Sequence, residues 1–232
     1  MKSDLPKVLH KLAGKTLLEH VLEATDRLDP AAIHIVIGHR ADQVKETLAS
    51  HPLSERINWV YQTEQLGTGH AVAQALPDID PASSVLIVAG DVPLIEPETL
   101  RPLCTPDGGG IHLLTAVLPD ACGFGRIIRD ADDGGVTEIV EHKDASEAQR
   151  NIREINTGVM CARADALTNW LSSVKNDNAQ GEYYLPDIIA LAVAEDKPVT
   201  AVVTADTLQI TGINSRSELA SLERRFQQHR AE

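Results

Sequence analysis

The chain has 232 residues, enough for one large domain or two small ones, and its 43% hydrophobic and 24% charged residues are ordinary for a soluble globular protein. The net charge of −13 argues against nucleic acid as a partner, because a phosphate backbone needs a basic face, whereas a small polyphosphate needs only local cations or a bridging metal. The three cysteines form no CxxC pair, so neither a disulfide framework nor a zinc site is predicted. The amino-terminal segment MKSDLPK has no apolar stretch typical of a signal peptide, and no run reaches membrane-spanning length. We therefore expect a cytoplasmic protein that engages no membrane.

The first half alternates helical and strand patterns. After a possible cap at Thr16, apolar residues recur at helical spacing, and IHIVI at 33–37 is typical of a short buried strand. The elements that follow are a weaker helix with Val44 and Leu48, a strand end at 59–62, a helix that opens at GTG (67–69), and the strand VLIVA at 85–89. Two successive strand–helix units of similar length predict parallel strands with crossover helices, as in a doubly wound α/β sheet.

The pattern changes from about residue 111. Strands are predicted at 111–118, at 126–129 and 136–140 as a hairpin around DDGG, at 156–161 and at 199–203. Helices are predicted at 164–174, 184–193 and 215–228. No linker, low-complexity tract or internal repeat separates the two halves, so we expect one domain over 1–232 with a mixed second half.

Two segments stand out at the expected ligand edge, because ligands of open parallel sheets sit beyond the carboxyl ends of the strands. Gly90-Asp91 follows the VLIVA strand, and Gln62 ends a strand that precedes the GTG helix start. Glycines there let backbone amides approach a ligand, and a helix amino terminus favours anions. A strand-ending Asp is about as often a helix cap or turn former as a metal ligand, and GTG is more often a turn than a binding loop. With neither GxGxxG nor GxxxxGK[ST] present, the residues alone predict an α/β domain that binds a ligand at the strand ends.

A set of ordered motifs resembles one family over essentially the whole chain. The motifs are SDLPKVLHKLAGK (3–15), EQLGTGHA (64–71), GDVPL (90–94), GFGRI (123–127), VEHKDA (140–145), EINTG (154–158), NAQGEYYLPDI (178–188) and GINSR (212–216). In this order and spacing they resemble the N-acetylglucosamine-1-phosphate uridylyltransferase domain of the bifunctional bacterial GlmU proteins. The resemblance implies a Rossmann-like, doubly wound and mostly parallel mixed sheet, with a nucleotide-binding half at 1–110 and a sugar-binding half at 111–232.

The resemblance also implies roles for individual residues. Asp91 and Asn214 match the positions that hold Mg²⁺, a hard cation that prefers oxygen ligands. Lys7 matches the lysine that meets phosphate, and Lys7 and Asp91 are the expected catalytic residues. The remaining substrate-binding positions are Gln62, Gly67 and Thr68 for uracil, Ala89 and Gly90 before Asp91, and Gly125, Glu141, Asn156 and Thr157 for the N-acetylglucosamine moiety. By residue type alone, Asn214 is a turn residue, Lys7 a solvated surface lysine and Glu141 a partner of His142 or Lys143.

The implied reaction joins UTP and N-acetylglucosamine-1-phosphate to give UDP-N-acetylglucosamine and pyrophosphate, for cell-wall and lipopolysaccharide precursors. It needs positioning and charge neutralisation by Mg²⁺ and lysine, and no protein nucleophile. No Ser/His/Asp or Cys/His constellation is evident, which agrees with this chemistry. A non-catalytic sugar-nucleotide-binding remnant is the rival hypothesis, and oligomeric state is left open.

The sequence departs from the family pattern at its ends. Family members start with a strand and a loop of the form LAAGxGTRM, and Met1 falls where that loop's final methionine would stand. A hexapeptide-repeat β-helix with acetyltransferase activity follows in bifunctional members. We therefore expect this chain to lack the phosphate loop and the acetyltransferase. A misassigned start, a fragment of a longer gene and a genuine loss of catalysis are the three explanations left open. Ala89 also replaces a larger or hydroxylated residue common before Gly-Asp.

Overall fold

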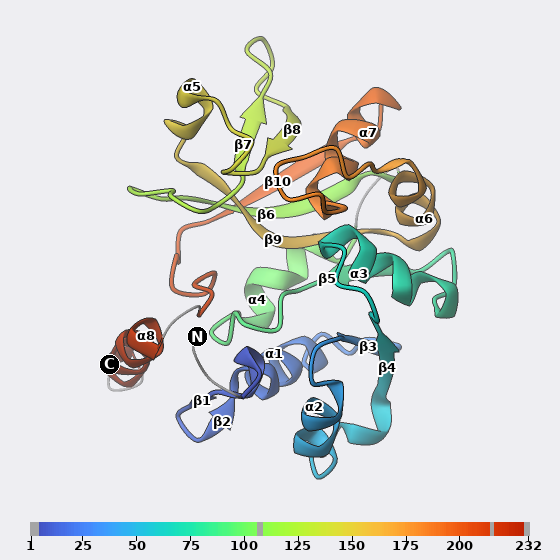
Figure 1. Ribbon diagram of the computed structural model, residues 1–232. Coiled ribbons are helices and arrows are strands. Elements are labelled where there is room, and N and C mark those ends of the chain that lie inside the picture. Colours follow the sequence, from blue (N-terminus) through green and yellow to red (C-terminus); the bar gives the residue numbers. More distant parts are fainter. Residues whose placement is uncertain (1–4, 106–108, 214–215, 230–232) are drawn as a thin grey trace.

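The computed structural model describes residues 5–105, 109–213 and 216–229. The chain forms two groups of elements, which lie below and above the middle of Figure 1. The lower group holds the short strands β1 and β2, the helices α1 and α2, and the strands β3 and β4. The upper group is built on a six-stranded sheet that carries α6 and α7.

The lower group follows the predicted order closely. Its elements are the 3-10 turn η1 (Lys7–Leu9), β1 (Lys11–Leu12), β2 (Lys15–Thr16), α1 (Leu17–Asp26), β3 (Ile33–Ile37), α2 (Ala41–Leu48) and β4 (Ile57–Tyr61). Strands β3 and β4 pair in parallel, with Ile33 opposite Ile57, and α2 forms the crossover between them. The predicted strand–helix–strand unit is therefore confirmed.

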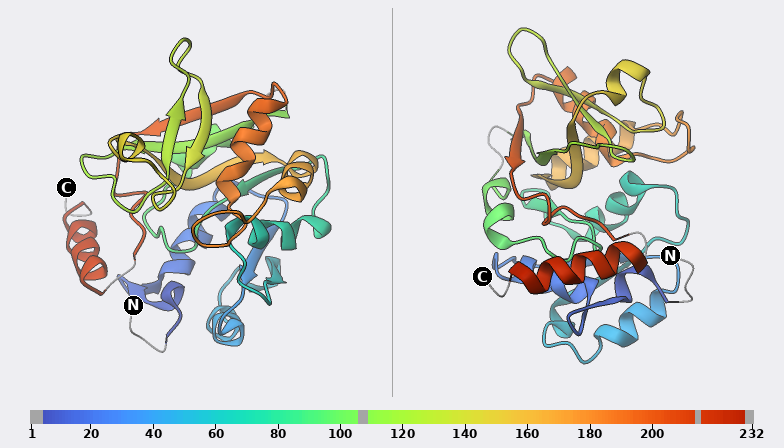
Figure 2. Two further views of the ribbon diagram at one scale, coloured as in Figure 1. Left: turned by 45° about the horizontal axis from the view of Figure 1, so that its top comes forward. Right: turned by 90° about the vertical axis from the view of Figure 1, so that its left-hand side faces the viewer.

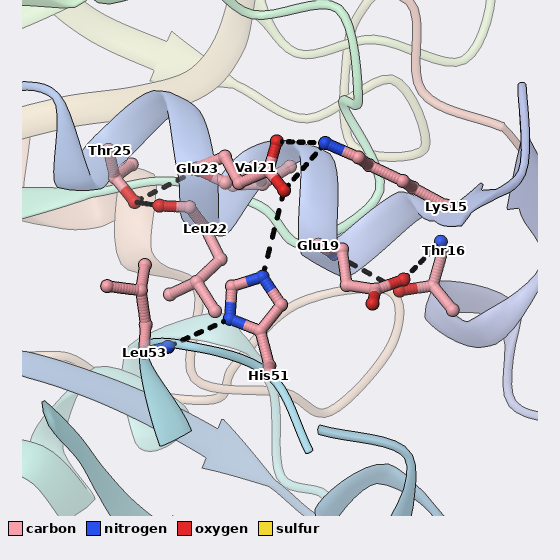
Figure 3. A network of polar contacts seen from close by, with 9 residues as sticks. All are labelled: Lys15, Thr16, Glu19, Val21, Leu22, Glu23, Thr25, His51 and Leu53. Carbon is pink, nitrogen blue, oxygen red and sulfur yellow. Dashed lines mark hydrogen bonds and ion pairs between the residues drawn. The ribbon is translucent and has the colours of Figure 1, made fainter. Parts of the chain in front are cut away.

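Helix α1 begins where the sequence predicts. The Thr16 hydroxyl accepts a hydrogen bond from the Glu19 backbone N–H at 3.2 Å, and the Glu19 carboxylate accepts from the Thr16 N–H at 2.6 Å. This reciprocal pair satisfies two backbone donors that a helix start would otherwise leave unpaired. Figure 3 shows the polar network beside it, in which His51 lies between the Leu53 backbone N–H and the Glu23 carboxylate. The network ties α1 to the segment that follows α2.

Three elements connect the lower group to the upper one: α3 (Thr68–Ala75), β5 (Ser84–Ile87) and α4 (Pro97–Leu100). Helix α3 starts at the predicted GTG. Strand β5 ends two residues before the predicted end of VLIVA, because its pairing with the neighbouring strand stops at Ile87.

The upper group contains β6 (Ile111–Val117), β7 (Arg126–Arg129), β8 (Val136–Val140), α5 (Glu147–Arg150), β9 (Glu154–Arg163), α6 (Ala164–Ser173), α7 (Ile188–Ala194) and β10 (Val199–Thr204). The last helix, α8 (Arg216–His229), lies beside the lower group. The predicted β7–β8 hairpin is confirmed, β9 is longer than the sequence predicts, and the helix predicted at 184–193 opens as the 3-10 turn Leu185–Asp187.

The sheet order corrects one part of the predicted fold. The strands run β10-β6-β9-β7-β8, with β5 also paired to β9. Among the described strands only β3–β4 and β10–β6 are parallel pairs, so the expectation of a mostly parallel sheet is wrong, although the mixed α/β class is confirmed. The reason is that β9 runs antiparallel to β5, β6 and β7, all of which it touches. Strands β3 and β4 form a sheet of their own.

Apolar residues form separate clusters under these elements. One lies between the six-stranded sheet, α6 and α7, and includes the fully buried Trp170. Another joins α1, α2, β3 and β4. A small cluster of Leu12, Leu17, Ile213 and Leu222 packs α8 beside the β1–β2 hairpin, as Figure 2 shows. Within the described residues, no helix is long and apolar enough to cross a bilayer.

Candidate functional site

Lys7 and Asp91 lie together, although 84 positions separate them in the sequence. Lys7 opens the turn η1, and Asp91 follows β5 after a short loop. The Lys7 ammonium forms an ion pair with Asp91 Oδ2, and both side chains are partly exposed, at 34% and 21%. Two of the predicted site residues are thus brought into direct contact at the carboxyl end of a strand.

A third segment reaches the same place from the far end of the chain. The Ile213 backbone N–H donates to the Asp91 carbonyl at 3.3 Å, and Ile213 itself is fully buried. A Cβ on Gly212 would lie 3.5 Å from Asp91 Oδ2, at ordinary contact distance, so this segment lies directly beside the carboxylate. Asn214, the predicted partner of Asp91, lies outside the described residues, but its neighbour Ile213 is hydrogen-bonded to Asp91.

Ala89 and Gly90 precede this carboxylate. Ala89 packs partly buried against the apolar cluster that includes Val21 and Leu114. A Cβ on Gly90 would lie 3.3 Å from the Leu18 side chain and 3.4 Å from that of Val8, which is tighter than ordinary contact. The glycine lets the chain pass close to α1 and η1, and so sets the approach of Asp91 to Lys7.

Gln62 and Gly67 form a second group. Gln62 follows β4, and its Nε2 donates to the Gly67 carbonyl at 3.0 Å and contacts His70 Nδ1 at 3.0 Å. Gly67 precedes α3 with a φ of +108°, and an added Cβ would lie 2.6 Å from the Tyr183 carbonyl oxygen. Only glycine fits there, because both the backbone angle and the space exclude a side chain.

The amino terminus of α3 is docked on a segment of the second half. Gly69 N–H donates to the Tyr183 carbonyl at 2.8 Å, and Tyr183 N–H donates to the Leu66 carbonyl at 2.7 Å. The Thr68 hydroxyl accepts from the Leu185 N–H at 3.1 Å. The predicted uracil-reading positions are therefore part of a contact between residues 66–69 and 183–185.

Gly125, Glu141 and Asn156 form a third group, at the ends of β7, β8 and β9. The Asn156 N–H donates to the Gly125 carbonyl at 2.9 Å, and a Cβ on Gly125 would lie 3.1 Å from Glu141 Oε1. Asn156 Oδ1 accepts from the Gly158 N–H at 3.0 Å. Thr157 is adjacent, but its hydroxyl donates to the Leu114 carbonyl at 2.7 Å and so helps to hold β9 against β6.

Acidic side chains surround Glu141. Burial raises the pKa of Glu141 above its ordinary value, and the nearby charges of Asp187 and Asp144 raise it further, while Arg126 acts in the opposite direction. Burial and the charge of Asp144 also raise the pKa of Asp187. A partly desolvated carboxylate of this kind is suited to accept hydrogen bonds from hydroxyl groups.

The sequence motifs predict no individual role for three residues that the structure places beside these groups: Tyr183, Asp187 and Arg126. Tyr183 and Asp187 lie within the NAQGEYYLPDI motif, which carried the resemblance but to which no single role was given. Tyr183 hydrogen-bonds to residues more than a hundred positions earlier in the chain. Asp187 lies close enough to Glu141 for its charge to raise the pKa of that carboxyl. Neither is visible as a local pattern.

Comparison with known proteins gives three kinds of match. Residues 1–115 match the model of the MobA-like NTP transferase domain. The "Bifunctional protein GlmU" of Pseudomonas paraeruginosa is 52% identical over 235 residues, and that of Bordetella petrii is 49% identical over 234 residues. Each match covers 100% of this chain and 50% of the relative, so the chain spans about half the length of these curated relatives.

Solved structures agree on the fold. A UDP-glucose pyrophosphorylase complexed with UDP-glucose matches with a TM-score of 0.74 at 15% identity, over 97% of this chain and 91% of that chain. The HddC structure from Yersinia pseudotuberculosis, complexed with GMP-PN, matches with a TM-score of 0.65 at 18% identity, over 97% and 92%. The likeness extends over nearly the whole of both chains and confirms the α/β nucleotidyltransferase fold.

Proposed function

We propose a function from the premise that this chain belongs to the family of the GlmU proteins and corresponds to their nucleotidyltransferase half. It transfers UMP from UTP to N-acetylglucosamine-1-phosphate, and so supplies UDP-N-acetylglucosamine for cell-envelope precursors in the cytoplasm. Residues 1–110 form its nucleotide-binding half and residues 111–232 its sugar-binding half. The observation that carries this proposal is the convergence of Lys7, Asp91 and the 212–213 segment at the end of β5.

The arrangement around Asp91 suits phosphoryl chemistry. The carboxylate holds the Lys7 ammonium at the strand end, so a cation already stands where an anionic substrate would arrive. Gln62 and the backbone at Gly67 and Thr68 offer an amide and N–H and C=O groups for base recognition. Glu141 and Asn156 provide acceptors for sugar hydroxyls and an amide donor. Our assignment of both substrates depends on these groups.

The donor set also fits a divalent metal. Asp91 and Asn214 would hold Mg²⁺ through hard oxygen atoms, and Gly212 leaves the space beside Asp91 Oδ2 without a side chain. When bound, Mg²⁺ would neutralise charge on the phosphate oxygens.

The reaction requires no covalent intermediate on the protein. A phosphate oxygen of the sugar phosphate forms a bond to the α-phosphorus of UTP, and the bond to the bridging oxygen breaks with its electron pair leaving on pyrophosphate. The protein orients the two anions and offsets their repulsion, and Lys7, paired with Asp91, supplies a positive charge for this.

The test is pyrophosphate release from UTP and N-acetylglucosamine-1-phosphate with Mg²⁺. Asp91→Asn should lower turnover by about a hundredfold or more, because a metal ligand and the partner of Lys7 are lost together. Asp42→Asn, which removes an exposed carboxylate on α2, is the matched control and should retain full turnover. Circular dichroism should show that both variants keep the fold.

Near-normal turnover in Asp91→Asn would contradict the assignment of this site. If the unmodified chain binds UDP-N-acetylglucosamine but releases no pyrophosphate, the non-catalytic alternative holds instead. Failure to bind either substrate would reject the proposed function altogether.

A further inference from the structure

A cavity lies beside the start of β7 and the end of β8, lined by residues other than those of the proposed site. Its volume is about 360 Å³, within the lower range for small-molecule sites. Its lining includes Asp120, Cys122, Arg126, His142, Arg150 and Arg153. None of the twelve residues assigned above to substrate or metal lines it.

Arg126 is the unusual member of this lining. It is only 2% exposed, and its Nε has no hydrogen-bond partner. Its other nitrogens donate to the Phe124 carbonyl, to the Arg150 carbonyl at 3.3 Å and to His142 Nδ1 at 3.5 Å. No carboxylate of a described residue forms an ion pair with it. A buried guanidinium without an ion-paired carboxylate is costly to keep, because the water around it has been removed and no salt bridge replaces it.

The rest of the lining adds to this positive charge. Arg150 and Arg153 are exposed and lie at the end of α5 and just before β9, so their side chains are available to a ligand. His142 Nδ1 accepts a hydrogen bond from Arg126, so the ring N–H is at Nε2. That nitrogen lies 3.9 Å from Cys122 Sγ. Three arginines against the single Asp120 give this cavity a net positive charge on a chain whose overall charge is −13. The cavity therefore attracts anions selectively on an otherwise acidic surface.

We propose that this cavity binds a small oxyanion, as a phosphate group or the carboxylates of a small organic acid. Arg126 provides a fixed buried charge at its wall, and Arg150 and Arg153 provide charged donors at its exposed side. Guanidinium groups match both phosphate and carboxylate because their parallel N–H donors fit two oxygen atoms at once. The ligand replaces the partner that Arg126 lacks.

The position of the cavity links it to the sugar-binding positions. Gly125 and Arg126 are neighbours at the start of β7, and successive side chains of a strand face opposite sides. Glu141 and His142 are likewise adjacent, and the charge of Arg126 already acts on Glu141.

The test is calorimetric titration of the chain with inorganic phosphate and, separately, with malonate, at constant ionic strength. The double variant Arg150→Gln/Arg153→Gln should weaken binding at least about tenfold, because two charge-assisted contacts are lost. The double variant Arg101→Gln/Lys197→Gln removes the same charge from exposed positions elsewhere and should bind as the unmodified chain does. The two ligands distinguish a phosphate site from a carboxylate site.

Phosphate also has a second candidate location, at Lys7. Lys7→Gln removes that location and should leave binding in the cavity unchanged, which separates this proposal from the proposed function. Binding that is lost in Lys7→Gln and kept in Arg150→Gln/Arg153→Gln would overturn the proposal. So would equal weakening in both double variants, or no binding of either anion.

Discussion

The ionised form of the Glu141 carboxylate destabilises the fold, but the proposed role of this residue requires that form. It lies partly buried beside Asp144 and Asp187, and burial followed by these two charges raises its pKa. A carboxylate in such surroundings is costly when ionised, yet its proposed role is to accept hydrogen bonds from sugar hydroxyls. A bound sugar would supply the hydrogen bonds that the unliganded carboxylate lacks. Binding and stability are therefore in competition at this residue.

Replacing Glu141 by Gln should stabilise the chain at neutral pH and abolish its use of the sugar phosphate. Below pH 4.5, the ordinary value for this carboxyl, the side chain is protonated in the folded and the unfolded chain alike. As pH rises above 4.5 the folded chain keeps a proton that the unfolded chain releases, so the free energy of unfolding falls. The gain in melting temperature for Glu141→Gln should thus be largest at pH 7 and shrink toward pH 4.5.

Glu147→Gln is the control for removing one exposed carboxylate from the same half of the chain. Melting curves of both variants from pH 4 to pH 8 give the comparison. A melting temperature for Glu141→Gln that stays below that of the unmodified chain at pH 7 would contradict the assigned cause of the raised pKa.

Helix α3 is one of the elements through which the two halves of the chain meet, besides the β5–β9 pairing. The Gly69 backbone N–H donates to the Tyr183 carbonyl, the Thr68 hydroxyl accepts from the Leu185 N–H, and Leu66, just before the helix, accepts from the Tyr183 N–H. The contact depends on close approach, since an added Cβ at Gly67 would lie 2.6 Å from a carbonyl oxygen. The position and conformation of the loop at 66–69, which we propose reads uracil, are thus fixed by a segment from the other half.

The Gly67→Ala variant tests whether overlap with the Tyr183 carbonyl destabilises the chain beyond the cost of a positive φ alone. A non-glycine residue at positive φ costs about 1–3 kcal/mol, and overlap with the Tyr183 carbonyl adds to this. Gly181→Ala is the matched control, because its φ is +67° and nothing lies within 4 Å of an added Cβ. Urea denaturation should show a larger loss of unfolding free energy for Gly67→Ala than for Gly181→Ala. Equal losses would mean that the contact with 183–185 adapts easily.

The sequence predicts helices and strands that a pattern of neighbouring residues specifies, but it does not predict which strands pair with each other. The apolar run IHIVI and the Thr16 cap depend on neighbouring residues, so β3 and α1 begin where expected. The antiparallel pairing of β5 with β9 depends on residues about 75 positions apart, and no local pattern encodes it. The same holds for the site: Asp91 and Lys7 were predicted singly through the family resemblance, whereas the buried charge of Arg126 emerges only from tertiary packing.

At the scale of the whole molecule, the β3–β4 sheet and the six-stranded sheet share no strand pairing among the described residues, and the short β1–β2 hairpin forms a third sheet. The β3–β4 sheet packs with α1 and α2 on its own apolar cluster, and β6 and β9 lie inside the six-stranded sheet. Side-chain packing and the contact of α3 with residues 183–185 join these two sheets. Within each sheet, by contrast, the backbone hydrogen bonds between strands form and break cooperatively. Regions joined in this way open with different free energies.

Native-state hydrogen exchange should therefore divide the amides into two classes. Those of β3 and β4 should exchange through openings of lower free energy than those of β6 and β9, because a two-stranded sheet has fewer supporting ladders. The measurement is exchange as a function of low denaturant concentration. A single opening free energy shared by all four strands would show that the molecule unfolds as one unit.

This division has a spectroscopic consequence, because the chain has two tryptophans, of which one lies in the β3–β4 sheet and the other packs against the six-stranded sheet. Trp59 lies in β4, half-buried, with the Lys45 ammonium 5.9 Å from its ring. Trp170 lies in α6, 2% exposed, and its indole N–H donates to Glu195 at 3.0 Å. Trp59 is therefore the redder emitter and Trp170 the bluer one. Intrinsic fluorescence, resolved by wavelength or by replacing either ring with Phe, follows the unfolding of each sheet separately without an added label.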